Sequence, residues 1–250
     1  MGKKHAYQLA KHQRLQKEAA QKKKMQRLMG YTLGVILLAC IGLIAYGSLS
    51  GSQSKTPESI DAREFRYEAQ PVLGAKDAPV KIVEFADFKC PACRHFEQTM
   101  LPQLQKDFID SGIAQLYFIN YPIVSPEADS RTAAMAGEAV YSQNPQAFWP
   151  FYRAVYASQG DERETWATAD ALVQIAKEAK VNVDYAKLKA DIESQTFAKA
   201  VRDDEAIVKK LGIGGTPTIY INGQALPVDA TFDYAAIKEI IQKAKERSGQ

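Results

Sequence analysis

The sequence predicts an α/β fold that carries an all-helical insertion and follows a single membrane-spanning helix. Residues 31–49 contain no charged side chain, which is typical of a transmembrane helix. Strand-like runs lie at 80–88 and 113–121, with a helical pattern between them. Residues 122–207 are helical in pattern, and a strand signal returns only at 218–221. A small sheet with an all-helical insertion between two of its strands accounts for the signals after residue 80.

The positive charge of the chain is concentrated at its N-terminus. Residues 1–30 hold nine Lys or Arg and one Glu, a net charge of +8, whereas the whole chain has +3 and the remainder is therefore −5. At about 1.5 Å per residue, residues 31–49 match the roughly 30 Å hydrocarbon core of a bilayer. Because basic residues flank only the N-terminal side, the positive-inside rule places the N-terminus in the cytoplasm. We therefore expect a basic cytoplasmic tail at 1–30, a transmembrane signal-anchor at 31–49 in the cell membrane, a linker at 50–64 and an extracytoplasmic domain at 65–250.

Three other interpretations of the N-terminus are weaker. A cleaved signal peptide is disfavoured by the long basic leader and by the lack of a clear small-x-small cleavage site. Lipid attachment at Cys40 is disfavoured because residues 41–45 remain apolar. Nucleic-acid binding by the tail is the weakest, since a neighbouring membrane span explains the basic charge. We expect no nucleic-acid partner, while anchor cleavage and lipidation stay open.

Turn and helix signals delimit the elements of the first half of the domain. A turn at 74–79 precedes the first strand, and a helix follows over 91–108 with a kink at Pro102. The insertion covers about 122–207. Its helical segments lie near 127–142, 146–158, 165–179, 183–194 and 197–210.

The last part of the chain predicts a hairpin and a closing helix. Asn222-Gly223 is a strong turn signal directly after the last long strand. The closing helix is expected at 231–247, with Thr231 or Asp233 as its N-cap.

Cys90-Pro91-Ala92-Cys93 directly follows the first predicted strand. The spacing lets the two sulfurs form a small disulfide or separate as a dithiol. Pro91 suits the first turn of a helix, where its missing N–H is not needed. Cys90 then faces unpaired N–H groups and the positive end of the helix dipole, which stabilise a thiolate. Such a thiol beside a second thiol is equipped for thiol–disulfide exchange, which the oxidising compartment outside the cytoplasm suits.

Several motifs together resemble one known family. Phe85-x-x-Phe88-x-Cys90-Pro91-x-Cys93, the helical insertion, and Gly215-Thr216-Pro217-Thr218 before a strand occur in the order found in the DsbA family of thiol-disulfide oxidoreductases. The chain is most similar to the membrane-anchored Gram-positive members. The resemblance covers roughly 65–250 and implies a thioredoxin-like fold with an all-helical insertion.

The resemblance also implies roles for the motif residues. Cys90 is the exposed nucleophile, Cys93 is the buried resolving thiol, and Pro217 is a cis-proline facing them. Thr216 offers backbone hydrogen bonds to a substrate peptide. X-Pro bonds are the ones that readily become cis, and a proline at a strand start leaves an edge free for peptide pairing. A trans proline that merely opens the strand is the alternative.

Glu84 matches a buried acid that the family is thought to use in proton transfer. It lies six residues before Cys90, and strand alternation places it on the same face as Ile82. A buried carboxyl has a raised pKa and can give or take a proton during exchange; a solvated edge residue is the alternative. Glu97, four residues after Cys93, also matches a family position, but a glutamate there is more often a plain charge on a helix surface.

The sequence departs from the best-known family member at Ala92, where that enzyme has histidine. An imidazolium there would stabilise the Cys90 thiolate and the reduced form, so we expect a milder oxidant. Pro91 and Ala92 border the nucleophile and are expected to contact substrate. Lys89 could replace part of the missing charge, although a lysine at a strand end is usually solvated. His95 falls on another helix face and is expected at the surface.

We therefore expect an extracytoplasmic disulfide oxidase that donates the Cys90–Cys93 disulfide to reduced secreted or surface proteins. We expect a monomer that needs no organic cofactor and has no metal at the redox site, while a bound structural metal elsewhere stays open. The resemblance implies reoxidation by a membrane quinone-linked protein. A membrane-tethered thioredoxin-like reductase, for instance in cytochrome maturation, is the main alternative, and the long insertion argues against it. A zinc site lacks ligands, since only His95 among the histidines lies outside the tail. The short linker leaves no room for an isomerase's dimerisation module, and the two cysteines argue against a redox-inert chaperone module.

Overall fold

The computed structural model describes residues 60–248 of the chain. The expected tail at 1–30, the anchor at 31–49, Cys40 and the first ten residues of the expected linker lie outside the described residues. Within 60–248, no helix combines the length and the apolar character needed to cross a bilayer.

Five strands form one mixed sheet in the order β1-β3-β2-β4-β5. β2 (Val80–Ala86) and β3 (Ala114–Asn120) form the central, parallel pair, while the remaining neighbours are antiparallel. The others are β1 (Val72–Leu73), β4 (Thr218–Ile221) and β5 (Gln224–Ala225). β2 and β3 are buried along almost their whole length, which explains their nearly continuous apolar sequences.

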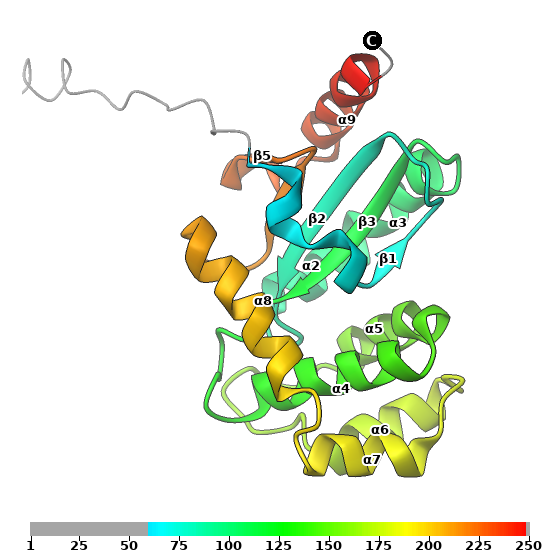
Figure 1. Cartoon of the computed structure of the whole chain (residues 1–250), viewed down its shortest axis with the longest axis vertical. Coiled ribbons are helices and arrows are strands. Elements are labelled where there is room, and N and C mark those ends of the chain that lie inside the picture. Colours follow the sequence, from blue (N-terminus) through cyan, green and yellow to red (C-terminus); the bar gives the residue numbers. More distant parts are fainter. Residues whose placement is uncertain (1–59, 249–250) are drawn as a thin grey trace, which may run out of the picture. The chain divides into compact units, whose positions relative to one another are not determined.

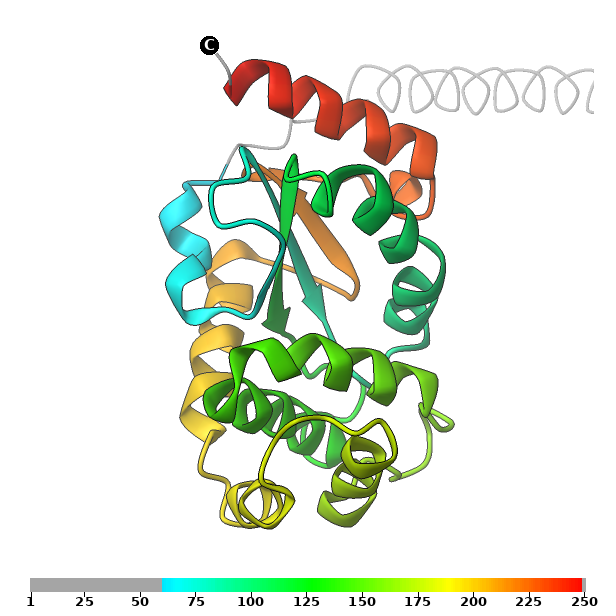
Figure 2. The same cartoon turned by 90° about the vertical axis from the view of Figure 1, so that its right-hand side faces the viewer.

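The helices cover the sheet and build a separate layer at one end of it. Their bounds are η1 Ala62–Phe65, η2 Tyr67–Ala69, α2 Pro91–Thr99, α3 Leu101–Leu104, the π-helical turn η3 Gln105–Ile109, α4 Asp129–Gln143, η4 Pro145–Ala147, α5 Phe148–Ala157, α6 Ala169–Glu178, α7 Tyr185–Glu193, α8 Ala198–Leu211, η5 Val228–Ala230 and α9 Tyr234–Ser248. α4 to α7 gather at the end where β2 and β3 terminate, and α8 leads back along the sheet (Figure 1). In the perpendicular view, α5 crosses below the carboxyl ends of these strands (Figure 2). The predicted thioredoxin-like fold with an all-helical insertion between β3 and β4 is therefore confirmed.

The two faces of the sheet have separate apolar cores. Ile82 belongs to the larger core, which includes residues of α2, α5 and α9. Val83 and Phe85 point to the opposite face, where they pack with Phe65 of η1 and with α8. Glu84 contacts α5 and so lies on the side of Ile82, as strand alternation predicts.

The expected helix at 91–108 is three elements rather than one kinked helix. α2 ends at Thr99, α3 starts at Leu101, and the π-helical turn follows. Pro102 has no N–H to donate and its ring crowds the carbonyl group four residues earlier, so the chain breaks the regular helix at this point.

Capping side chains set two helix starts later than the periodicity predicts. α6 begins at Ala169 instead of 165 because the Thr168 hydroxyl accepts the N–H of Ala171 at 3.2 Å. α9 begins at Tyr234 because the Asp233 side chain accepts hydrogen bonds from two N–H groups of its first turn at 2.9 and 3.1 Å. Asp233 and not Thr231 is therefore the cap.

Sequence patterns missed β1, since two residues are too few to show alternation.

Candidate active site

Cys90 and Cys93 lie at the N-terminus of α2. Cys90 is the N-cap residue with extended backbone, and Pro91 occupies the first helical position, as predicted. Both cysteines are free thiols. Cys90 is 7% exposed and Cys93 is fully buried. The expectation of an exposed Cys90 is therefore wrong in degree: its sulfur lies 3.4 Å from the carbonyl oxygen of Thr216, whose loop covers it.

The two thiols have pKa values shifted in opposite directions. Hydrogen bonding from the Cys93 thiol, helped by the Thr216 side chain and by N–H groups of the first helical turn, lowers the pKa of Cys90 to about 6 although burial opposes this. Burial first, and then the neighbouring Cys90, raise the pKa of Cys93 well above its usual range. One sulfur is therefore a thiolate at neutral pH while the other holds its proton.

The Thr216–Pro217 loop faces the cysteine pair directly before β4. The peptide bond between these two residues is cis, as predicted. Both residues are half-buried, and in the thiol form Cys90 donates a hydrogen bond to the Thr216 carbonyl oxygen. Pro91 is exposed and Ala92 is half-buried in the first turn of α2, directly after Cys90 along the chain.

Glu84 is fully buried in the central strand, which rules out a solvated edge residue. The hydroxyl group of Tyr152 donates to its Oε2 atom at 2.9 Å, whereas its Oε1 atom has no hydrogen-bond partner within residues 60–248. Burial raises the pKa of Glu84 to about 8, with smaller contributions from the charges of Glu97 and Cys90. Its charge in turn raises the pKa of Cys93. Glu84 thus titrates near neutral pH and is electrostatically coupled to the cysteine pair.

Glu97 lies one helical turn beyond Cys93 and is half-buried. Burial raises the pKa of its carboxyl, and the charge of Arg153 on α5 opposes this. It is therefore not a fully solvated helix charge, and it borders a small cavity of about 200 Å³ that Arg153 also lines.

Lys89 is buried, contrary to the expectation of a solvated lysine. Its side chain is 1% exposed, and its Nζ donates to Asp129 Oδ1 at 2.6 Å and to the carbonyl of Glu164 at 2.7 Å. The Asp129 carboxylate balances its charge, so Lys89 does not act as a free cation that replaces the histidine missing at Ala92.

His95 is exposed, as predicted, and its ring lies 5.2 Å from that of Phe232.

Sequence reasoning missed the polar residues that hold the turn before α2. Asp87 Oδ2 accepts the N–H groups of Ile123 and Val124 and the hydroxyl of Ser130, each at 2.8 Å. Its Oδ1 accepts the N–H of Lys89 at 2.8 Å. The one local signal is a carboxyl between two apolar residues at a strand end; the partners come from distant parts of the chain.

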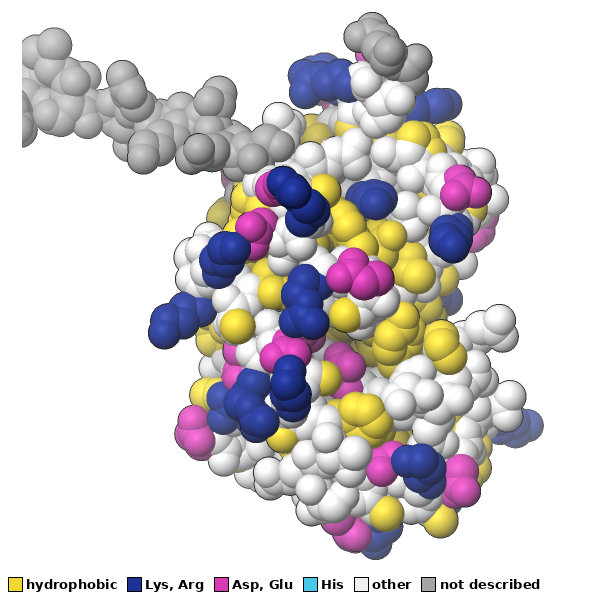
Figure 3. Space-filling view, in the orientation of Figure 1, with side chains coloured by type: hydrophobic (Ala, Val, Ile, Leu, Met, Phe, Trp, Pro, Cys, Tyr) yellow, Lys and Arg dark blue, Asp and Glu magenta, His cyan; other side chains and the backbone are white. Residues whose placement is uncertain are grey.

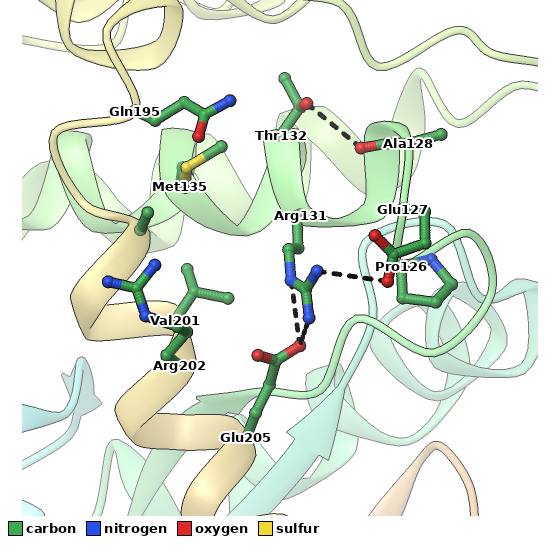
Figure 4. A pocket seen from close by; sticks show the side chains of 11 residues that line it. Pro126, Glu127, Ala128, Arg131, Thr132, Met135, Gln195, Val201, Arg202 and Glu205 are labelled. Carbon is green, nitrogen blue, oxygen red and sulfur yellow. Dashed lines mark hydrogen bonds and ion pairs between the residues drawn. The ribbon is translucent and has the colours of Figure 1, made fainter.

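Two surface features lie apart from the cysteine pair. A pocket of about 350 Å³ between α4 and α8 has Arg131 bridging Glu205 at 2.7 Å and Glu127 at 3.6 Å, and none of its lining residues belongs to the redox site (Figure 4). In the space-filling view, Lys and Arg are interspersed with Asp and Glu and with apolar patches (Figure 3). The charge on this face is mixed, so it gives nucleic-acid binding no support.

Comparisons with known proteins agree with the geometry. A family model described as thioredoxin matches residues 66–243. The probable disulfide bond formation protein D of Bacillus cereus is 40% identical over 222 residues, which are 88% of this chain and 98% of that protein. Disulfide bond formation protein D of Bacillus subtilis is 38% identical over 192 residues, 76% of this chain and 84% of that protein.

Solved structures give the same result. The crystal structure of oxidised BdbD from Bacillus subtilis has a TM-score of 0.67 at 38% identity and covers 72% of this chain and 94% of that one. The crystal structure of Chlamydia trachomatis DsbA, at 22% identity, shows likeness of fold with a TM-score of 0.62 over 70% of this chain and 91% of that one. The chain therefore belongs to the thioredoxin-like DsbA family of thiol-disulfide oxidoreductases, among the disulfide oxidases represented by disulfide bond formation protein D.

Proposed function

We propose that this chain is a membrane-anchored disulfide oxidase that transfers its Cys90–Cys93 disulfide to reduced secreted or surface proteins. The observation that carries the proposal is the placement of Cys90 at the N-cap of α2, against the Thr216–Pro217 loop. The family relationship supports oxidation over reduction. No organic cofactor enters, because the disulfide itself is the oxidant.

In the first step, a substrate thiolate attacks Sγ of Cys90. A bond forms between the two sulfurs, the Cys90–Cys93 bond breaks, and its electron pair goes to Sγ of Cys93. Because the pKa of Cys93 is raised, this sulfur takes up a proton. Glu84 can supply that proton, since its own pKa of about 8 keeps it largely protonated at neutral pH.

In the second step, another substrate thiolate attacks the substrate sulfur of the mixed disulfide. The substrate disulfide forms and Cys90 leaves as a thiolate, which its lowered pKa of about 6 favours. The enzyme now holds two electrons as a dithiol. A quinone-linked membrane protein that accepts them is required for turnover, and the family supports such a partner.

Substrate contacts are assigned to the surface around Cys90. Thr216 precedes β4 and offers backbone groups to an extended peptide, and Pro91 and Ala92 follow Cys90 in the first turn of α2. Ala92 carries no charge, so the thiolate lacks the stabilisation that an imidazolium would supply there. We therefore propose a milder oxidant than a histidine-containing relative.

A redox titration of the full chain tests oxidation against reduction. An equilibrium midpoint well above about −200 mV supports the oxidase, whereas a value near that of thioredoxin, about −270 mV, indicates a reductase. The reduced and oxidised forms at each glutathione ratio are counted by alkylation of the free thiols.

The extracytoplasmic location has its own test. The hydropathy of residues 31–49 and the basic charge of 1–30 support an anchor with the catalytic domain outside the cytoplasm. Protease added to intact cells after removal of the cell wall should then degrade the C-terminal domain. A domain that stays protected until the cells are lysed contradicts this topology.

A further inference from the structure

Two buried side chains, one in the last turn of α5 and one just after that helix, donate hydrogen bonds to the turn that carries Cys90. The Tyr156 hydroxyl donates to the carbonyl oxygen of Asp87 at 3.2 Å. Nε2 of Gln159 donates to the carbonyl oxygens of Phe88 at 2.8 Å and of Cys90 at 3.1 Å. The helical insertion thus supplies donors to three backbone carbonyl groups of one four-residue segment.

The orientation of the Gln159 amide follows from its surroundings. The side chain is only 8% exposed, and the two groups it faces are both carbonyl oxygens. Only the NH₂ end of an amide can bind two acceptors, because the opposite orientation would set three oxygens against one another. The main-chain carbonyl of Gln159 accepts from Arg94 Nη1 at 3.3 Å, which ties the same residue to α2.

These bonds affect the charge near the Cys90 sulfur. A backbone carbonyl oxygen carries partial negative charge, and close to a sulfur it disfavours the thiolate. A donor that binds the oxygen neutralises part of this charge. The Cys90 carbonyl also accepts the first helical bond of α2, from the N–H of Arg94 at 3.1 Å, so Gln159 acts where the helix begins.

We propose that Gln159 is a positioning residue of the redox reaction: its amide holds the Phe88 and Cys90 carbonyl groups and thereby favours the reduced, thiolate form of Cys90. The inference rests on Cys90 being the reactive cysteine, as proposed above. Gln159 does not contact the sulfur itself. It acts through the backbone that places the sulfur at the start of α2.

The test uses the reduced full chain in a Cys40→Ser background, so that Cys90 and Cys93 are the two thiols present. Gln159→Met keeps the length of the side chain and removes both donors. Gln159→Glu sets a carboxyl against the two carbonyl oxygens. Gln146→Leu is the matched control, because Gln146 is exposed in η4, directly before α5, and has no side-chain hydrogen bond within the described residues.

Two quantities are measured: the pH midpoint of thiolate formation from ultraviolet absorbance, and the equilibrium constant with glutathione. Loss of two hydrogen bonds in Gln159→Met should raise the midpoint and shift the glutathione equilibrium toward the oxidised enzyme by about threefold to tenfold. A tenfold shift corresponds to about 30 mV for this two-electron couple. Gln159→Glu should shift both quantities further in the same direction, and Gln146→Leu should change neither.

A purely structural role gives a different result. If Gln159→Met unfolds more easily but retains the wild-type midpoint and equilibrium constant, the proposal is overturned. Should that variant not fold, Gln159→Glu decides alone: an unchanged midpoint and an unchanged equilibrium constant in that variant overturn the proposal. The two proposals fail separately. If the wild-type chain has the redox potential of a reductase, the oxidase function is refuted. The pH midpoint of thiolate formation in the Gln159 variants still decides the role of Gln159.

Discussion

Tyr152 of α5 donates a 2.9 Å hydrogen bond to Oε2 of Glu84 in the central strand. The bond connects the helical insertion to the buried acid of the redox site. It partly offsets the burial that raises the pKa of Glu84 to about 8. Tyr152 is itself fully buried, and its pKa is raised well above the usual range, so it stays a neutral donor.

Glu84→Gln should change how stability depends on pH. The pKa of Glu84 is near 4.5 when unfolded and about 8 when folded, so the folded state binds the extra proton between these values. The stability from this group is fully present below about pH 4.5 and is lost as the pH rises through 8. One proton changes the free energy of unfolding by at most about 1.4 kcal/mol per pH unit.

The measurement is urea unfolding of the oxidised protein at several pH values. The variant should lose less stability than the wild type between pH 5 and 8, and its thiol exchange should be slower while the fold is intact. Parallel stability profiles for the two proteins would show that Glu84 does not titrate in this window.

Cys90 should be alkylated as a thiolate with a midpoint near pH 6. Its lowered pKa of about 6, against 9.0 for an ordinary cysteine, stabilises the folded reduced protein. This stability is fully present above pH 9 and is lost as the pH falls through 6. Oxidised protein has no such thiol, so the stability of the reduced form relative to the oxidised form should rise between pH 6 and 8.

Iodoacetamide rates in a Cys40→Ser background provide the measurement, with mass analysis to identify the modified residue. A midpoint above pH 8 for Cys90, or preferential alkylation of Cys93, contradicts the assignment.

Cys93→Ala should trap mixed disulfides that the wild type resolves. In this variant, the Cys90 thiolate attacks oxidised glutathione, one glutathione leaves as a thiolate, and the other stays bound to Cys90. Wild type releases the bound glutathione when Cys93 attacks Cys90. Cys90→Ala is the control, because the remaining thiol at Cys93 is fully buried and has a raised pKa. Equal trapping by the two variants, seen as the glutathione adduct by mass spectrometry, would refute Cys90 as the nucleophile.

Sequence reasoning succeeded where the signal is local. The two cysteines, Pro91 and the Thr216–Pro217 pair each belong to a short motif whose geometry follows from neighbouring residues. It failed for contacts made across the chain. Tyr152 lies 68 positions from Glu84, and Gln159 lies 69 positions from Cys90, so no local spacing reveals these pairs.

The burial of Lys89 illustrates the same limit. A lysine at a strand end is solvated unless another segment covers it, and the partner here is 40 positions away. Sequence patterning predicted the insertion as a set of helices. It could not predict that the start of α4 places a carboxylate against the turn before Cys90.

Asp129→Asn should strongly destabilise the fold because it leaves Lys89 buried without a counter-charge. The Lys89 and Asp129 side chains are 1% and 3% exposed, and their charged atoms are 2.6 Å apart. Removing one partner of such a buried pair costs about 3–5 kcal/mol in the free energy of unfolding. Lys89→Met should lower the free energy of unfolding by less, since the Asp129 carboxylate still accepts hydrogen bonds from the N–H groups of Trp166 and Ala167 at 2.9 and 3.0 Å.

Asp203→Asn is the matched control for this pair. Asp203 bonds Lys199 at 2.7 Å on α8, but the lysine is 78% exposed, so solvent screens the interaction. Urea unfolding of the reduced proteins should separate the two sites clearly. Equal destabilisation by Asp129→Asn and Asp203→Asn would mean that burial adds nothing to the Lys89–Asp129 pair, and that the insertion is not held to the redox turn through it.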